Sequence, residues 1–120
     1  MANRLLTEDE IKSVFTPLIK LVRDELVVKA NGDDNLLWAL RRKLAKELVY
    51  DERDKPMVRK KLKLKKKLDQ LNKCAECFEE LPSTGTVLDR LEAMKGYNEE
   101  NTRVLCPVCD AKIQKERGYR

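Results

Sequence analysis

Four cysteines in two close pairs constrain this chain more than any other feature of its sequence. The pairs are Cys74-x-x-Cys77 and Cys106-x-x-Cys109, and residues 78–105 separate them. Each pair can bring two thiolates to one side of a tetrahedral metal ion, so that two pairs complete a four-sulfur site. Because four thiolates leave no coordination position open, the spacing predicts one structural zinc ion, which stabilises the fold and takes no part in catalysis.

Other uses of paired cysteines stay open, namely two disulfide bonds or a redox-active pair. A redox-active pair is expected near a β-α-β pattern, which this sequence does not have. The N-terminal residues contain no apolar run of the length that a secretion signal needs, and no stretch approaches the ~20 apolar residues of a membrane span. We therefore expect a cytoplasmic protein with reduced thiols and no membrane partner.

The spacing of apolar residues changes at about residue 72. Before it, apolar residues recur at intervals of three and four, which predicts helices. After it, segments are short and turn residues are frequent, with short strands expected near residues 86–88 and 103–105 and a closing helix at 110–117. We expect an α+β fold, mostly α, with a helical region 1–72 and a four-cysteine module 73–120 that contains a short β-hairpin and a short helix.

The limits of the N-terminal helices are marked by capping residues and prolines. Thr7 and Glu10 form a capping box, and Pro17 either kinks the first helix or restarts it with Thr16 as its cap. Residues 31–35 predict a turn that caps a second, leucine-rich helix, and Pro56 suits the first turn of a third helix that ends near residue 71 or 72. The apolar stripes of these helices either pack together as a small bundle or pair with a second copy or another protein.

The C-terminal half resembles the HNH family of ββα-metal nucleases, in its four-cysteine branch. That branch combines a Cys-x-x-Cys pair, a strand ending in Asp-His, a glycine-containing loop, an asparagine, and a second Cys-x-x-Cys pair followed by His or Asn. Here the order is the first cysteine pair, Leu88-Asp89-Arg90, Gly96, Asn101 and "VLCPVCD", residues 104–110. The resemblance covers about residues 72–118, and it implies a module of degenerate HNH type.

The chain departs from this family at its catalytic histidines, because it contains no histidine at all. The family's general base falls on Arg90, and arginine stays protonated and cannot accept a proton from water. The resemblance places Asp89 and Asp110 at the family's metal-binding positions, where two carboxylates would suit Mg²⁺ or Mn²⁺. Asn101 would hydrogen-bond across the loop of the hairpin. Alternatively, the two aspartates are surface acids or salt-bridge partners, and Asn101 is an ordinary turn residue. Arg90 either forms an ion pair, for which Asp89 and Asp110 are candidate partners, or contacts phosphate.

The net charge of +5 is concentrated before the first cysteine pair. Residues 55–73 hold nine basic side chains and one acid, so the rest of the chain is slightly acidic. A lysine-rich helix is often only a solvated face, but this one directly precedes a module that resembles nucleases. We expect phosphate contacts with weak sequence preference from these basic side chains and from Arg90: Arg59, Lys60, Lys61, Lys63, Lys65, Lys66, Lys67 and Lys73. Aromatic residues do not interleave with them, and Phe78 is expected to pack.

These observations predict a zinc-stabilised nucleic-acid-binding protein on an inactivated HNH nuclease scaffold, with duplex DNA backbone as the expected partner. A first alternative is an active metal-dependent endonuclease that uses Asp89 and Asp110. A second alternative is a protein-interaction module, such as a regulator of a nucleic-acid enzyme, whose lysines meet an acidic protein surface. The helical region would then supply a partner-binding or homodimer surface.

Overall fold

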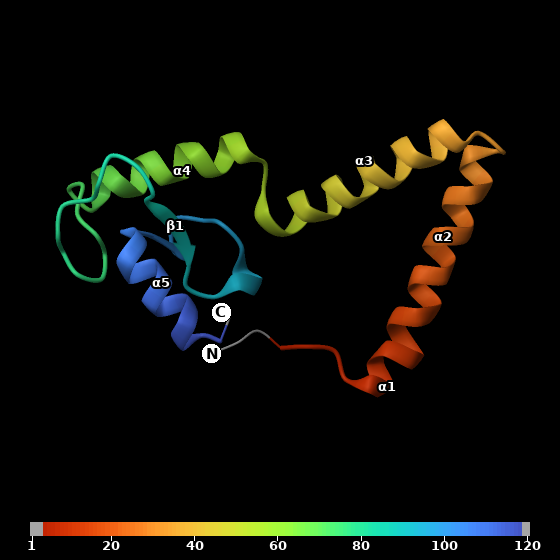
Figure 1. The fold of residues 1–120 in the computed structure, drawn as a ribbon, viewed down its shortest axis with the longest axis horizontal. Coiled ribbons are helices and arrows are strands. Elements are labelled where there is room, and N and C mark those ends of the chain that lie inside the picture. Colours follow the sequence, from red (N-terminus) through yellow and green to blue (C-terminus); the bar gives the residue numbers. More distant parts are fainter. Residues whose placement is uncertain (1–3, 119–120) are drawn as a thin grey trace. The chain divides into compact units, whose positions relative to one another are not determined.

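A computed structural model describes residues 4–118 and divides them into two compact units. One unit is Arg4–Val49 and the other contains residues 50–118. The first holds α1 (Glu8–Glu10), the π-helical turn η1 (Ile11–Phe15), α2 (Thr16–Ala30) and most of α3 (Asp34–Arg53), as Figure 1 shows. The second holds the end of α3, then α4 (Pro56–Asp69), β1 (Val87–Arg90), the 3-10 turn η2 (Ala93–Lys95), β2 (Thr102–Leu105) and α5 (Pro107–Glu116).

The first helical segment runs through Pro17 without a new start. The predicted capping box is present, since Thr7 accepts from the Glu10 backbone and the Glu10 side chain accepts from the Thr7 backbone. Thr16 has helical torsion angles and does not cap the start of a new helix. The predicted restart of the helix, with Thr16 as its cap, is therefore wrong. The Thr16 N–H reaches back five residues to the Ile11 carbonyl instead. This wider turn gives room to a proline ring that would otherwise crowd the preceding turn.

The turn between α2 and α3 is closed by two short polar residues. Asn31 takes the left-handed conformation (φ 49°) and ends α2, a role that suits asparagine. The Asp33 carboxylate accepts from the Leu36 N–H at 3.0 Å and caps α3. Residues of the turn itself therefore end α2 and cap α3, as the sequence predicted for residues 31–35.

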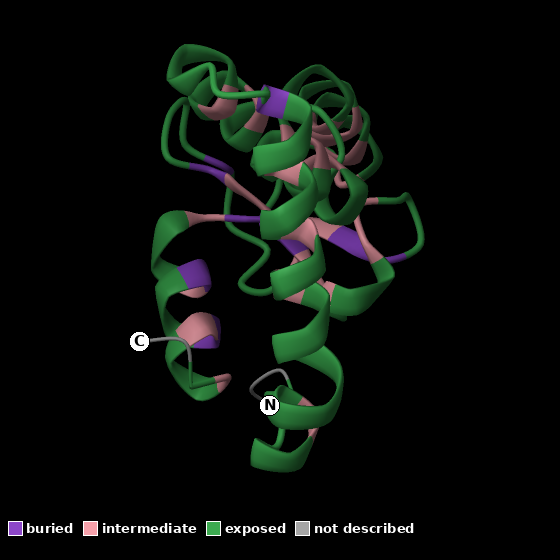
Figure 2. Cartoon of the chain, turned by 90° about the vertical axis from the view of Figure 1, so that its right-hand side faces the viewer, coloured by how far each residue is buried: buried purple, intermediate pink, exposed green. Residues whose placement is uncertain are grey.

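Within Arg4–Val49, the apolar side chains do not form a buried core. Ala30 is the only buried residue of this unit among those described. Leu18, Leu21 and Val28 expose more than half of their surface, and Figure 2 draws these helices mainly as exposed. The bundle that the leucine stripes predict is therefore not formed by these helices alone, because two helices without a third layer leave much of each apolar stripe in solvent.

The core of the other unit lies between the hairpin, α5 and the first cysteine pair. It contains Cys74, Leu81, Val104, Leu105 and Ile113, all buried. β1 and β2 pair antiparallel in the register Val87↔Leu105, Leu88↔Val104, Asp89↔Arg103 and Arg90↔Thr102. The predicted hairpin and closing helix are confirmed, although the helix begins at Pro107 rather than at residue 110. A proline fits this first-turn position because it needs no backbone partner there.

The lysine-rich helix α4 belongs to this same unit, so the predicted boundary at residues 72 and 73 falls inside it. α4 contacts β2 through its polar face: the Gln70 side chain accepts from the Val104 N–H at 2.8 Å and donates to the Val104 carbonyl at 3.0 Å. The predicted apolar positions of the helix instead face solvent, with Met57, Leu64, Leu68 and Leu71 exposed by 72%, 56%, 77% and 79%. These four residues are called the outer stripe below.

Two further observations concern single predictions. Phe78 does not pack, as was expected, but is 72% exposed. It follows the first cysteine pair with a left-handed backbone (φ 62°), which turns its ring away from the core. None of the helices within residues 4–118 combines the length and the apolar character that crossing a membrane would need.

Candidate metal centre

The hairpin and the loop after α4 bring the four cysteines together. Their four sulfur atoms all lie within 4.8 Å of one another, and the Sγ atoms of Cys77 and Cys106 are 3.9 Å apart. A tetrahedral zinc ion with Zn–S bonds of about 2.3 Å would require sulfur separations of about 3.8 Å. All four cysteines are free of disulfide bonds, which leaves their thiols available as ligands. The donor set and its size therefore fit a metal ion of this kind.

Backbone N–H groups surround the sulfurs. The Cys74 Sγ accepts from the backbone of Glu76 at 3.5 Å and of Cys106 at 3.4 Å, and the Cys106 Sγ accepts from Cys109 at 3.5 Å. The last of these contacts places Cys106 as the side-chain cap of α5, directly before Pro107. Such N–H···S contacts hold a thiolate in place and stabilise its negative charge.

The cysteine pKa values follow from these surroundings. Burial acts to raise the pKa of the Cys74 thiol, but the backbone donors of Cys106, Cys77 and Glu76 outweigh it and bring that pKa to about 6. Burial and the neighbouring cysteine sulfurs raise the pKa of Cys109 to about 12. Four sulfurs this close cannot all be deprotonated without a cation between them. Binding of a metal would therefore release protons from the site.

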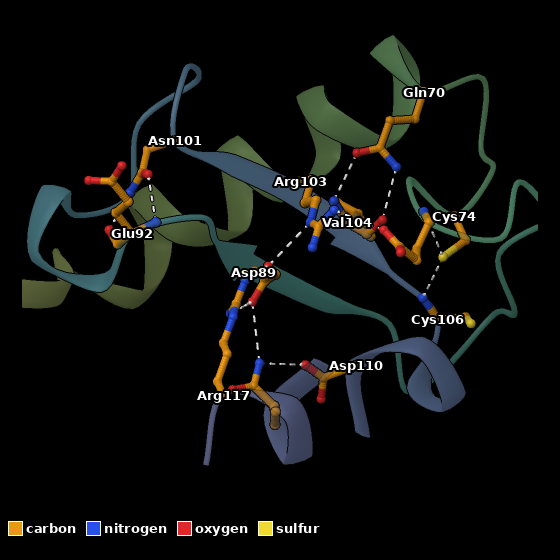
Figure 3. A network of polar contacts seen from close by, with 12 residues as sticks. Gln70, Cys74, Asp89, Glu92, Asn101, Arg103, Val104, Cys106, Asp110 and Arg117 are labelled. Carbon is orange, nitrogen blue, oxygen red and sulfur yellow. Dashed lines mark hydrogen bonds and ion pairs between the residues drawn. The ribbon is translucent and has the colours of Figure 1, made fainter. Parts of the chain in front are cut away.

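A second polar centre lies beside the hairpin, around the buried carboxylate of Asp89 (Figure 3). Arg117 from α5 donates to both of its oxygens, at 2.7 and 3.1 Å. Arg103, which faces Asp89 across the sheet, donates from Nε at 3.3 Å and reaches Glu76 of the first cysteine pair at 3.1 Å. Asp89 is thus a doubly ion-paired carboxylate that joins β1 to Arg103 on β2 and to Arg117 directly after α5.

Asp89 and Asp110 come close to each other, but a protein side chain bridges them. The Nε2 atom of Gln114 donates to Asp89 at 3.3 Å and to Asp110 at 3.1 Å. Asp110 is itself buried on the first turn of α5. Among residues 4–118, the four cysteines are the only group of three or more acidic or cysteine side chains arranged to hold a metal ion. The two aspartates are not part of such a group, and the Gln114 amide lies between them.

Arg90 points away from Asp89, because successive residues of a strand point to opposite faces. It pairs with Glu52 at the end of α3 at 3.6 Å and donates to the Ala93 carbonyl at 3.1 Å. Its guanidinium carbon lies 4.8 Å from the ring centre of Tyr97. An ion pair of Arg90 with Asp89 or Asp110, one expectation from the sequence, is therefore wrong.

Asn101 makes the loop-crossing hydrogen bonds that the resemblance implies. Its amide nitrogen donates to the carbonyls of Glu92 and Gly96 at 2.8 and 2.7 Å, and its amide oxygen accepts from the Glu92 N–H at 3.0 Å. The residue is buried, at 6% exposure. Asn101 thus fixes the whole loop between β1 and β2 rather than serving as an ordinary turn residue.

The basic residues of α4 divide into two sets. Lys63 donates to the Thr86 carbonyl at 2.6 Å, Lys66 donates to the Glu99 carbonyl at 2.8 Å, and Lys65 pairs with Asp69 and Glu99. Burial, followed by the charge of Lys67, lowers the pKa of Lys63. These three residues therefore hold α4 to the loops of the module. Among the described residues, no side-chain ion pair or hydrogen bond engages the others on the predicted list before the first cysteine pair, which are Arg59, Lys60, Lys61, Lys67 and Lys73. Arg59 instead lies over the Tyr97 ring, with its guanidinium carbon 5.8 Å from the ring centre.

Four residues of this network were not predicted from the sequence: Gln70, Arg103, Gln114 and Arg117. Two of them, Arg103 and Gln114, could have been identified from sequence patterns. Arg103 is paired with Asp89 once the hairpin register is known, and Gln114 lies one helical turn after Asp110. Gln70 and Arg117 have no such local signal, because their partners are far away in the sequence.

Comparisons of the chain with protein-family models, with curated proteins and with solved structures give no match. The chain is mostly helical, with a two-stranded antiparallel sheet and four cysteines placed to hold a metal ion.

Proposed function

We propose that this chain is a zinc-stabilised nucleic-acid-binding protein, built on an HNH-like scaffold that has lost catalysis. The expected ligand is the duplex DNA backbone. The observation that carries the proposal is the combination of a four-sulfur site with a basic helix fastened to the same module. Zinc is the expected ion because four thiolates favour it over harder cations such as Mg²⁺.

The loss of catalysis is argued from two positions. Arg90 occupies the position of the family's general base and stays protonated. Asp89, the family's metal-binding acid, is only 4% exposed and accepts from Arg103 and Arg117. A divalent ion at Asp89 would have to displace both guanidinium groups from this carboxylate, which is unfavourable because both arginines are partly buried.

Nucleic-acid binding is argued from charge. Lys60, Lys61 and Lys73 are exposed and Lys67 is half-buried, and no side-chain contact with another described residue satisfies them. Four such ammonium groups on one helix and the loop that follows it attract a polyanion and release its counterions. Contacts of this kind position a protein on the backbone and read little sequence.

A plasmid-nicking assay, combined with a salt titration of duplex binding, tests the proposal. The protein is incubated with supercoiled plasmid in Mg²⁺ or Mn²⁺, and its binding to a labelled duplex is followed by fluorescence anisotropy at several NaCl concentrations. We expect no nicking, and an affinity that falls steeply as salt increases. Nicking that Asp89→Ala abolishes, in a variant that circular dichroism shows to be folded, would instead support an endonuclease. Zinc is measured in the same purified sample, and its absence would overturn the metal assignment.

A specific observation favours a second candidate, a protein-interaction module. The outer stripe of α4 presents large apolar side chains to solvent, and Lys60, Lys61 and Lys65 lie on the same helix beside it. Phosphates do not require apolar contacts, whereas an acidic amphipathic segment of another protein would use both the leucines and the lysines. A duplex affinity that is absent at low salt, together with a co-purifying acidic protein, would favour this candidate.

A further inference from the structure

The geometry points to a phosphate-binding site formed by Arg53, Arg59 and Arg90 around the ring of Tyr97. This arginine cluster is a feature of the unit that contains residues 50–118, and it shares no residue with the cysteine site. It would take one phosphate group of a nucleic-acid backbone. The inference rests on the proposed function and names the place where the backbone is held.

The three guanidinium groups converge on one aromatic side chain. The Cζ atoms of Arg90 and Arg59 lie 4.8 and 5.8 Å from the centre of the Tyr97 ring. The Nη2 atom of Arg53 lies 3.5 Å from the Tyr97 hydroxyl oxygen. A guanidinium group carries five N–H donors, so Arg90 keeps donors for a phosphate besides the Nη1 atom that it uses for Glu52 and the Ala93 carbonyl. The fork of donors on each arginine matches the oxygens of a phosphate.

Four different segments bring these side chains together, and the loop that carries the tyrosine is fixed. Arg53 is the last residue of α3, Arg59 lies on α4, and Arg90 ends β1. Gly96, directly before Tyr97, has φ 74°, and a Cβ there would lie 3.7 Å from the Glu52 carbonyl oxygen at the end of α3. Its own carbonyl accepts from Asn101. The backbone directly before the ring is therefore held by the buried side chain of Asn101.

The charge of the cluster is not balanced by the protein. Within residues 4–118, Glu52 is the only carboxylate that pairs with any of the three arginines, at 3.6 Å from Arg90, and its side chain is 64% exposed. Three positive groups and one negative group leave a local charge of about +2 by simple addition. Positive groups this close repel one another, and a bound anion relieves that repulsion, so the arrangement favours phosphate over a neutral ligand.

The arginine cluster and the exposed lysines of α4 would contact a phosphate backbone in different ways. Lys60 and Lys61 are single exposed charges on flexible stems, suited to a diffuse contact along a backbone. The arginine cluster has a fixed ring and three planar donors, so it can hold one phosphate in a defined place. It would therefore set where the module lies along the backbone, while the lysines add salt-dependent affinity.

The test measures binding of a labelled DNA duplex by fluorescence anisotropy at several NaCl concentrations, with the full chain. We expect Arg53→Gln and Arg90→Gln each to weaken binding about tenfold and to reduce the salt dependence by about one phosphate contact. Arg53 is exposed, so its variant is not expected to disturb folding even if that of Arg90 does. Lys112→Gln is the matched control, since it removes one exposed charge from the same unit outside the cluster and should change binding less than about twofold. Equal losses in Arg53→Gln and Lys112→Gln would overturn the site.

A second measurement separates failure of the site from failure of the proposed function. The Nε–Hε signals of the three arginines are followed by NMR while inorganic phosphate is added. If the chain does not bind the duplex but these signals shift and saturate, and Arg53→Gln removes the response of the others, the site takes free phosphate and the proposed function is wrong. If the signals do not respond to phosphate, and the arginine substitutions leave duplex binding unchanged, the site itself is wrong.

Discussion

The two units of this protein contain similar kinds of helices but differ in how they are stabilised. Arg4–Val49 has a single buried residue, Ala30, among those described, although it is rich in leucine and valine. Residues 50–118 bury five apolar or cysteine residues and also Thr86, Asp89, Asn101, Thr102 and Asp110. The second unit has a lower fraction of apolar residues, but its core also contains buried polar groups with partners, and its four cysteines are placed to hold a metal ion. A sequence can therefore specify helices without burying their apolar side chains in a core.

The largest effect is expected when the metal is removed. Structural zinc in small domains contributes about 10–16 kcal/mol of apparent binding free energy, which is folding free energy when no site exists in the unfolded chain. We expect a chelator, or Cys106→Ser, to abolish the dispersed NMR signals of residues 102–113. Signals of residues 16–30 should be unaffected, since no cysteine lies in that unit. If the dispersed NMR signals of the hairpin persist after complete chelation, a metal ion does not stabilise this unit, and the proposed difference between the two units is wrong.

The next effect concerns Asp89, whose loss leaves two arginines partly buried without their carboxylate. Asp89→Ala should lower the free energy of unfolding by about 3–5 kcal/mol, as is typical when one partner of a buried ion pair is removed. Urea unfolding followed by circular dichroism measures this. The control is Asp69→Asn, which breaks the exposed pair with Lys65 and should cost no more than about 1 kcal/mol. Similar costs for both variants would mean that the network does not stabilise the unit.

A smaller loss is expected at Asn101. Asn101→Ala removes hydrogen bonds to Glu92 and Gly96, and should cost about 2–3 kcal/mol because buried backbone groups lose their partners. Asn101→Asp should also destabilise, since a carboxylate would face the two carbonyl oxygens. Thermal unfolding of both variants is the measurement. If Asn101→Asp is as stable as the original chain, the proposed orientation of the amide is wrong.

The smallest effect on stability is expected in the outer stripe of α4. Leu68 is 77% exposed, so Leu68→Ser should change the free energy of unfolding by no more than about 0.5 kcal/mol. Leu105→Ala, at a fully buried position, should cost about 2–5 kcal/mol in the same urea experiment. A large loss in Leu68→Ser would show that the outer stripe is covered in solution, in support of the interaction module.

The sequence predicted those features that depend on neighbours along the chain. The capping box at Thr7, the start of α4 at Pro56 and the two strands follow from local patterns, and the cysteine spacing predicted the sulfur cluster. The orientation of α4 could not be predicted in this way. Its pattern suggests burial of the leucines, but Gln70, Lys63 and Lys66 hold its other face to the module by hydrogen bonds to backbone groups of distant residues.

The contact between Gln70 and Val104 also determines how this protein can meet other chains. The outer edge of β2 would otherwise offer a backbone N–H and a carbonyl to any extended peptide. The amide of Gln70 takes both groups of Val104, and the backbone of Ala75 donates to the same carbonyl at 3.1 Å. A side chain thus acts as the missing neighbouring strand. The sheet cannot be extended at this point of β2, so both fibril-like association and strand addition by a partner are blocked there.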